Sequence, residues 1–209
     1  TNNFLYFEAI HLTGVAVALL LQYQAPVLVA LYALLIQGQR FSGRLALSLA
    51  LTLTGCALVV RVYDPASVQL NLLGVLAGLG TALAFAFYIL TSRAALKFMR
   101  PWTLVAYGYL AASLVWALIV PPWRIVSLEL PVETWGAFLA IATLGTVIPF
   151  GLFINGLKHL PPTQAGILAT LEPVVATFAA YLMLGETLLP LQILGGGLVL
   201  AGAITVETR

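Results

Sequence analysis

The stretch that decides the fold is QAGILATLEPVVATFAAYLML, residues 164–184. Glu172 is its only charged residue. The stretch is long enough to cross a hydrocarbon layer, which takes roughly 20 apolar residues in a helix. It lacks the period-2 alternation of a membrane β-strand, so a membrane-spanning α-helix is predicted.

The composition of the whole chain agrees with this interpretation. Of 209 residues, 62% are hydrophobic and 8% are charged, and the mean hydropathy is +1.06. Soluble domains carry about 25% charged residues, so lipid is expected to cover this exterior. A single cysteine, Cys56, excludes an internal disulfide and a thiolate metal site. The sequence indicates no cofactor, no metal site and no nucleic-acid partner.

Charges, prolines and polar clusters divide the chain into seven predicted spans. A segment at residues 1–10, too short to cross, precedes them. The spans are Val15–Ile36, Phe41–Val60, Leu72–Leu90, Leu104–Val120, Trp135–Gly156, Gln164–Leu184 and Leu188–Val206.

The basic residues predict the orientation of these spans. One side of the membrane holds Arg40, Arg44, Arg93, Lys97, Arg100, Lys158 and Arg209, and the other holds only Arg61 and Arg124. Cytoplasmic loops are enriched in Lys and Arg. The C-terminus is therefore expected in the cytoplasm.

The chain also resembles itself at an offset of 147 residues. Five predicted spans separate Gly38 from its counterpart Gly185, and an odd number reverses the orientation of the second copy. Inverted repeats are typical of alternating-access transporters, whose substrate site lies near the midplane between the halves. The rarer residues that coincide without a gap are Pro26 with Pro173, Gly38 with Gly185, and Gly55 with Gly202.

Two segments resemble the EamA domain of the drug/metabolite transporter superfamily. Ala9–Val60 begins AIHLTGVAVALLLQYQAPVLVAL, and Gly156–Val206 contains a Pro-Val pair, then Gly-Glu, then a glycine-rich last helix. The stretch AFAFYILTSR, Ala84–Arg93, also resembles that family. The resemblance implies an all-α integral membrane bundle of inverted repeats. Residues 1–62 would be the C-terminal part of the first repeat, and residues 70–207 the complete second repeat.

The same offset gives an expectation about length. The first two spans of the second repeat map upstream of Thr1, so a complete protein of about ten spans and about 290 residues is expected, with about two and a half spans preceding Thr1.

Glu172 is the leading candidate for function. It stands about 12 Å into its span at 1.5 Å per residue, near the midplane, where an ionisable group usually faces a cavity and can carry a proton. Pro173 and Pro26 each lack a backbone donor, so two broken helices are expected. The alternative is that Glu172 only satisfies a neighbouring group at the kink. The candidates brought to the repeat interface are Glu172, Thr170, Pro173, Gln22, Tyr23, Gln24 and Pro26.

Three further polar residues are weaker candidates. Glu8 corresponds to Asn155 under the offset, and both lie nearer the membrane surface than Glu172. They are candidates for a gate or cavity rim, or for interfacial and interhelical hydrogen bonding. Tyr88 is a candidate for cavity lining, with packing as the alternative.

These observations favour a carrier of small metabolites in a bacterial inner membrane. The resemblance implies an exporter of amino acids or related compounds, with the lipid bilayer and a small-molecule substrate as partners. Coupling to protons through Glu172 is a hypothesis, and facilitated diffusion fits equally well. A carrier of nucleotide sugars or sugar phosphates is disfavoured because no Lys or Arg lies inside a span to neutralise phosphate. An intramembrane enzyme lacks its nucleophile and base, and a structural subunit leaves Glu172 unexplained.

The predicted orientation can be tested by labelling. In a Cys56→Ala background, cysteines at Ser67 and Val132 are expected to react with an impermeant thiol reagent added outside intact cells. Cysteines at Ser42 and Leu96 are expected to stay unlabelled until the membrane is permeabilised. The reverse pattern would show that the orientation is wrong.

Overall fold

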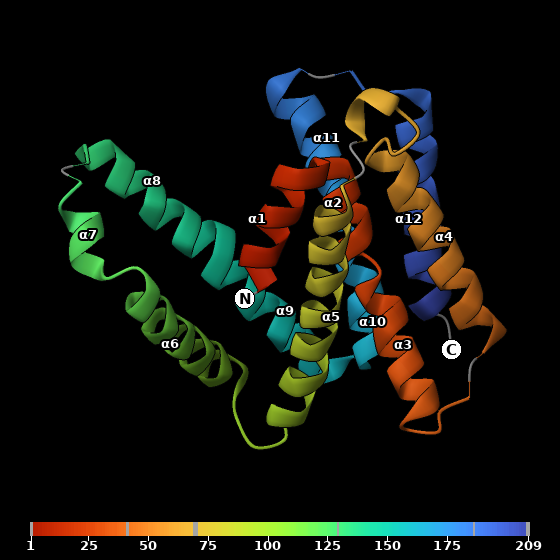
Figure 1. Cartoon of the computed structure of the whole chain (residues 1–209). Helices are drawn as coiled ribbons and strands as arrows, with labels where there is room; N and C mark the ends of the chain where they lie inside the picture. The colour runs from red at the N-terminus through yellow and green to blue at the C-terminus, as the bar shows by residue number, and fades with distance from the viewer. Residues whose placement is uncertain (1, 41, 69–70, 129, 186, 208–209) are drawn as a thin grey trace. The chain divides into compact units, whose positions relative to one another are not determined.

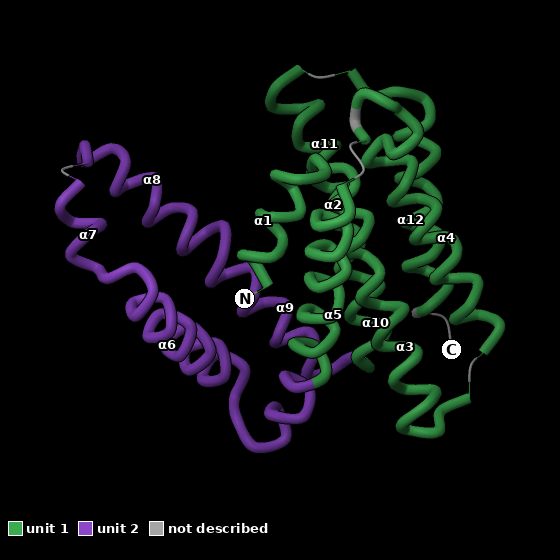
Figure 2. Tube along the Cα trace, in the orientation of Figure 1, with its two compact units in different colours: residues 1–90, 161–209 green, residues 91–160 purple. Residues whose placement is uncertain are grey.

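The computed structural model describes residues 2–40, 42–68, 71–128, 130–185 and 187–207 (Figure 1). These residues form helices and connecting turns, and no strand occurs among them. Phe41, Glu186 and Arg209, which entered the predicted spans, loops and charge count, lie outside the described residues. The chain divides into two compact units, residues 1–90 with 161–209, and residues 91–160 (Figure 2).

The predicted multi-span helical fold is confirmed. Within the described part of the chain, five helical stretches are long and apolar enough to cross a membrane: Val15–Leu35, Leu72–Ala95, Pro101–Ile119, Val132–His159 and Pro162–Leu184. Two shorter apolar helices, Gly43–Val59 and Pro190–Val206, correspond to the other two of the seven predicted spans.

The first unit contains both copies of the repeated segment. Its first copy comprises α2 (Val15–Gln22), α3 (Ala25–Leu35) and α4 (Gly43–Val59). Its second copy comprises α10 (Pro162–Ala169), α11 (Glu172–Leu184) and α12 (Pro190–Glu207). Each helix of the second copy begins 147 residues after its counterpart. The other elements are α1 (Asn2–Thr13), η1 (Pro65–Ser67) and most of α5 (Leu72–Ala95).

The two broken helices that the prolines predict are confirmed. Pro26 and Pro173 lie in the first turn of α3 and α11, where a missing backbone donor is tolerated. Before each proline the chain makes a tighter turn. Gln24 N donates to Leu21 O at 3.1 Å, and in the second copy Leu171 N donates to Leu168 O, also at 3.1 Å.

The two copies also end their broken helices alike. Gly38 and Gly185 have φ angles of 65° and 70°, in the left-handed region that glycine enters without penalty. Gly185 directly follows α11 as its C-cap. Such a helix stop is the usual use of a left-handed glycine.

The backbones of α4 and α12 approach each other closely in this unit. A Cβ placed on Gly55 would lie 2.6 Å from the carbonyl oxygen of Gly195, and one on Gly202 would lie 2.9 Å from that of Ser48. Under the offset, Gly55 corresponds to Gly202, and Ser48 corresponds to Gly195. The two contacts are therefore equivalent, and the helices run antiparallel, as inverted repeats require.

Two hydrogen bonds fasten this interface. The buried Ser48 Oγ donates to Gly202 O at 2.7 Å, and Gln192 Nε2 donates to Val59 O at 3.2 Å. Between helices in a membrane, each such bond contributes about 0.6 kcal/mol on average. Close backbone packing must supply the rest.

The second unit consists of the end of α5, then α6 (Pro101–Ile119), α7 (Pro122–Val126), α8 (Val132–Ala142), η2 (Thr143–Val147) and α9 (Ile148–His159). Arg93 Nη1 donates to Leu157 O at 2.8 Å and to Lys158 O at 2.7 Å, which satisfies the last carbonyls of α9. The span predicted as Trp135–Gly156 is a helix interrupted by a π-helical turn at η2. Pro149 follows this turn, and prolines and π-turns are common causes of helix kinks.

The α4–α12 contact predicts a position-specific effect of added volume. Gly55→Ala is expected to lower the stability by about 1–3 kcal/mol, because the new methyl group meets backbone rather than a movable side chain. Gly197→Ala in α12 is the matched control, since nothing lies within 4 Å of its added Cβ. Thermal unfolding in detergent measures both. Equal midpoints for the two variants would contradict the contact.

Candidate functional site

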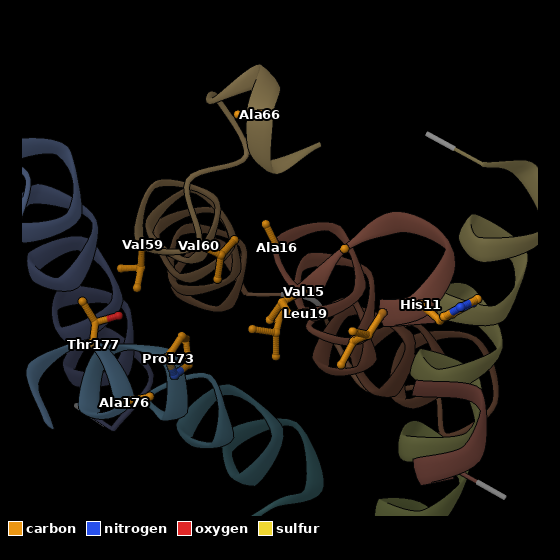
Figure 3. A pocket seen from close by; sticks show the side chains of 12 residues that line it. His11, Val15, Ala16, Leu19, Val59, Val60, Ala66, Pro173, Ala176 and Thr177 are labelled. Atoms are coloured by element: carbon orange, nitrogen blue, oxygen red, sulfur yellow. The ribbon is translucent and has the colours of Figure 1, made fainter. Parts of the chain in front are cut away.

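A cavity of about 580 Å³ lies within the first unit. Figure 3 shows its lining, which comes from the α1–α2 region, from α4 and η1, and from α11. Leu19 of α2 and Pro173 of α11 both line it. The volume is in the range of small-molecule sites, and the polar side chains of its lining are His11 and Thr177.

The inner end of the cavity is marked by three residues that lie one helical turn deeper than its lining. Residues four positions apart are neighbours on one helix face. Tyr6 and Tyr23 lie on the side of the lining residues away from the helix ends that border the cavity, and Glu172 is the first residue of α11, next to the lining residue Pro173. Tyr6 precedes Ile10 in α1, Tyr23 follows Leu19 after α2, and Glu172 precedes Ala176 in α11.

Packing brings two of these residues together. The Tyr23 side chain is 3% exposed and forms a buried cluster with Cys56 and Val199. Leu171 and Val174, which flank Glu172, pack against this cluster. The Glu172 carboxylate interacts electrostatically with the phenols of Tyr23 and Tyr6. The Glu172 side chain itself is exposed rather than packed inside the unit. The carboxyl group of Glu172 and the two phenols are thus within electrostatic range of one another, each one helical turn from a residue that lines the cavity.

One of these phenols has an unused hydrogen-bonding group. The buried Tyr23 hydroxyl has no hydrogen-bond partner among the described residues, and the same holds for Gln22 Oε1. A buried polar group without a partner is costly. Both groups stand at the break between α2 and α3, where the chain presents polar atoms in an otherwise apolar span.

Two other candidates at the breaks are occupied locally. Thr170 Oγ1 donates to Ile167 O at 2.6 Å, and the Thr170 carbonyl accepts from Cys56 Sγ at 3.7 Å. Gln24 Nε2 donates to Leu20 O at 3.2 Å. These bonds hold the breaks in shape.

The two prolines of the repeats have different neighbours. Pro26 packs on Gly166 of α10, where an added Cβ would be 3.4 Å from Pro26 Cα. The equivalent pair under the offset is Pro173 with Leu19, and both of these residues line the cavity. One member of an equivalent pair of contacts is therefore closed, and the other borders open space.

The structure does not place the three weaker candidates beside Tyr6, Tyr23 and Glu172. Glu8 is exposed on α1, and Tyr88 is half-buried in α5 and stacks on Phe85 with ring centroids 6.3 Å apart. Asn155 is exposed on α9 in the second unit. The described residues contain no group of three or more His, Cys, Asp or Glu side chains that could hold a metal ion.

Sequence reasoning missed Tyr6. The segment before Val15 is too short to cross a membrane alone, so its side chains carried no expectation. The four-residue spacing from Tyr6 to Ile10 acquires meaning only when Ile10 is known to line the cavity.

Comparisons with known proteins identify a family profile that matches this chain and several proteins that are similar to it. The profile of the EamA-like transporter family matches residues 1–61 and 72–208. A protein of Archaeoglobus fulgidus named as an uncharacterized transporter is 32% identical, over 95% of this chain and 69% of its own length. The threonine/homoserine exporter RhtA of Escherichia coli (strain K12) is 29% identical, over 97% of this chain and 65% of its own length.

The similarity extends to a solved fold. One crystal structure matches with a TM-score of 0.78 at 20% sequence identity, covering 99% of this chain and 71% of the solved chain. A third relative, the uncharacterized transporter YwfM of Bacillus subtilis, is 28% identical over 97% of this chain and 68% of its own length. The chain thus spans about two thirds of the length of the curated relatives it matches.

The cavity predicts a difference in thiol reactivity along α11. In a Cys56→Ala background, a cysteine at Thr177 is expected to react rapidly with a small hydrophilic methanethiosulfonate, because it faces the cavity. A cysteine at Leu182, exposed on the same helix but outside the cavity lining, is the control. It is expected to react slowly, since lipid suppresses thiolate formation. Equal rates in proteoliposomes would contradict a water-filled cavity.

Proposed function

The chain belongs to the EamA-like transporter family and is an integral membrane transporter, and from this premise we propose that it exports amino acids or related small metabolites by alternating access. The name of the RhtA relative supports the choice of amino acids. The proposed location is a bacterial inner membrane with the C-terminus in the cytoplasm, supported by the distribution of Lys and Arg.

The observation that carries the alternating-access proposal is the pair of unlike proline contacts. A carrier built from inverted repeats opens to one side when equivalent contacts differ, and exchanges them to open to the other. The open Leu19–Pro173 border and the closed Gly166–Pro26 contact have this relation. The repeats that would exchange conformation are residues 1–62 and 70–207.

The chemistry of the cavity supports a small, non-phosphorylated substrate. The described Lys and Arg residues lie near helix ends and in loops, so no fixed cation lies at depth to pair with phosphate. This argues against a nucleotide-sugar or sugar-phosphate carrier. The site candidates for substrate contact are those at the helix breaks, with Glu172 and Tyr23 first.

Proton coupling through Glu172 is the proposed source of energy. A carboxyl group at the inner end of a cavity can take a proton on one side of the membrane and release it on the other. Glu8, Asn155 and Tyr88 remain proposed as residues of the outer cavity or gate. They have lower priority because none of them lies at the helix breaks next to Pro26 and Pro173.

The proposed function is tested by measuring the export of amino acids from intact cells. Cells expressing the protein are loaded with L-threonine or L-homoserine as dipeptides, and the free amino acids that appear in the medium are measured against a vector control. Faster appearance is expected. Equal rates across a panel of amino acids and related metabolites would refute the proposal.

The substitution Glu172→Gln tests whether export is coupled to protons through this carboxyl group. The amide still forms hydrogen bonds, so folding and insertion are expected to persist, while export falls by at least tenfold or loses its dependence on external pH between about 5.5 and 8. Glu133→Gln, in the first turn of α8, is the matched control and is expected to behave like the parent. Parental export by Glu172→Gln at every pH would show that the carboxylate is structural.

A further inference from the structure

The geometry at the inner end of the cavity points to a ligand subsite that deepens the proposed function and rests on it. We propose that Tyr6, Tyr23 and Glu172 bind the positively charged amine of the substrate, with the Glu172 carboxylate supplying the charge and the two phenols supplying neutral acceptor oxygens.

The first argument is position. The three residues come from three different segments, α1, the α2–α3 break and α11, and each lies one turn beneath a cavity-lining residue. Tyr23 belongs to the buried cluster against which Leu171 and Val174, the neighbours of Glu172 in the chain, are packed. A substrate entering the cavity therefore reaches these groups last, at the point where the two broken helices meet.

The second argument is hydrogen bonding. A primary ammonium has three N–H donors and no acceptor. Carboxylate and phenol oxygens accept such donors, and the three side chains together offer one acceptor for each. The Tyr23 hydroxyl is buried and has no partner among the described residues, so its capacity is available to a ligand.

The third argument is charge. In the described part of the first unit, the basic side chains are Arg40, Arg44, Arg61 and His11. Arg40 and Arg44 stand around the start of α4, Arg61 pairs with Asp64 at 2.6 Å, and His11 lines the outer cavity. None of them is placed beside Glu172. An ionised carboxylate at this depth is costly without a counterion, and an ammonium supplies one.

The fourth argument is that the cavity lining can bind the other groups of the substrate. With the amine at Glu172, the substrate would extend towards Thr177, which lies on the same face of α11 one turn beyond Pro173. Thr177 can donate a hydroxyl hydrogen bond. The His11 ring lies on the opposite side of the lining and points away from Thr177 (Figure 3), so Thr177 is the proposed donor to the carboxylate of the substrate.

The subsite is tested by binding and competition with the purified protein in detergent. The probes are L-homoserine, 3-aminopropan-1-ol, which keeps its amine and lacks its carboxylate, and 4-hydroxybutanoate, which lacks the amine. We expect 3-aminopropan-1-ol to compete with L-homoserine and 4-hydroxybutanoate to compete at least tenfold less well. Tyr23→Phe is expected to weaken binding of the two amines about tenfold, the size of one hydrogen bond to a charged group, and to leave 4-hydroxybutanoate unchanged.

Matched controls separate this result from a general loss of structure. Tyr32→Phe, at an exposed tyrosine of α3, is expected to bind all probes like the parent. Equal weakening of amines and 4-hydroxybutanoate by Tyr23→Phe would overturn the proposal, as would competition by 4-hydroxybutanoate equal to that of the amine. So would Glu172→Gln binding the amines like the parent while losing only the pH dependence of export, because the carboxylate would then serve protons alone.

The failure of this inference can be told apart from failure of the proposed function. Export of amino acids without amine-dependent binding at these residues would leave the exporter standing and remove the subsite. Amine binding that depends on Tyr23 and Glu172, in a protein that exports no amino acid, would keep the subsite and point to other amines as the cargo.

Discussion

The backbone contact between α4 and α12 is the interaction against which α2, α10 and α11 of the first unit pack. In lipid, helices associate through close packing and hydrogen bonds rather than through the hydrophobic effect. Gly55 and Gly202 allow two backbones to touch, and the bond from Ser48 to Gly202 sets their register. Three of the four helices next to the breaks contact this pair: α2 and α11 contact α4, and α10 contacts both α4 and α12. The register of one antiparallel pair therefore decides where the two broken helices meet.

The two copies share the same helices and breaks, but the side chains at their breaks differ. The break of the first copy carries Tyr23, and the equivalent position of the second carries Thr170, whose hydroxyl bonds to its own helix. Ala25 occupies the position that Glu172 has in the other copy. Duplication thus accounts for the framework, and departures from it produce a single charged group with one unpartnered phenol beside it. A symmetric pair of carboxylates would repel each other at this depth, whereas one carboxylate can bind one cation.

The helices, the breaks and the inverted order of the copies could be predicted because their causes are local. Apolar runs set the spans, prolines set the breaks, and a fixed offset relates the copies. The π-helical turn before Pro149 could not be predicted, since a proline in a span is compatible with several kinds of kink. Tyr6 could not be predicted either, because its relevance depends on which helix α11 faces. Glu172 and Tyr23 were predicted from depth and from the adjacent proline, while their proximity required packing between distant segments.

The unlike neighbours of the two prolines set a limit on the proposed transport cycle. Gly166 of α10 faces Pro26, and a Cβ added at Gly166 would lie 3.4 Å from Pro26 Cα, so α10 and α3 are packed together at this point. The equivalent closure on the cavity side must be made by Leu19 against Pro173, with a branched side chain between the helices. Interiors resist overpacking, so α2 and α11 cannot approach as closely as α10 and α3 do. In the proposed cycle, Leu19 would fill the space between these helices. Because Tyr23 follows Leu19 by one helical turn, this closure would lie next to the proposed amine subsite.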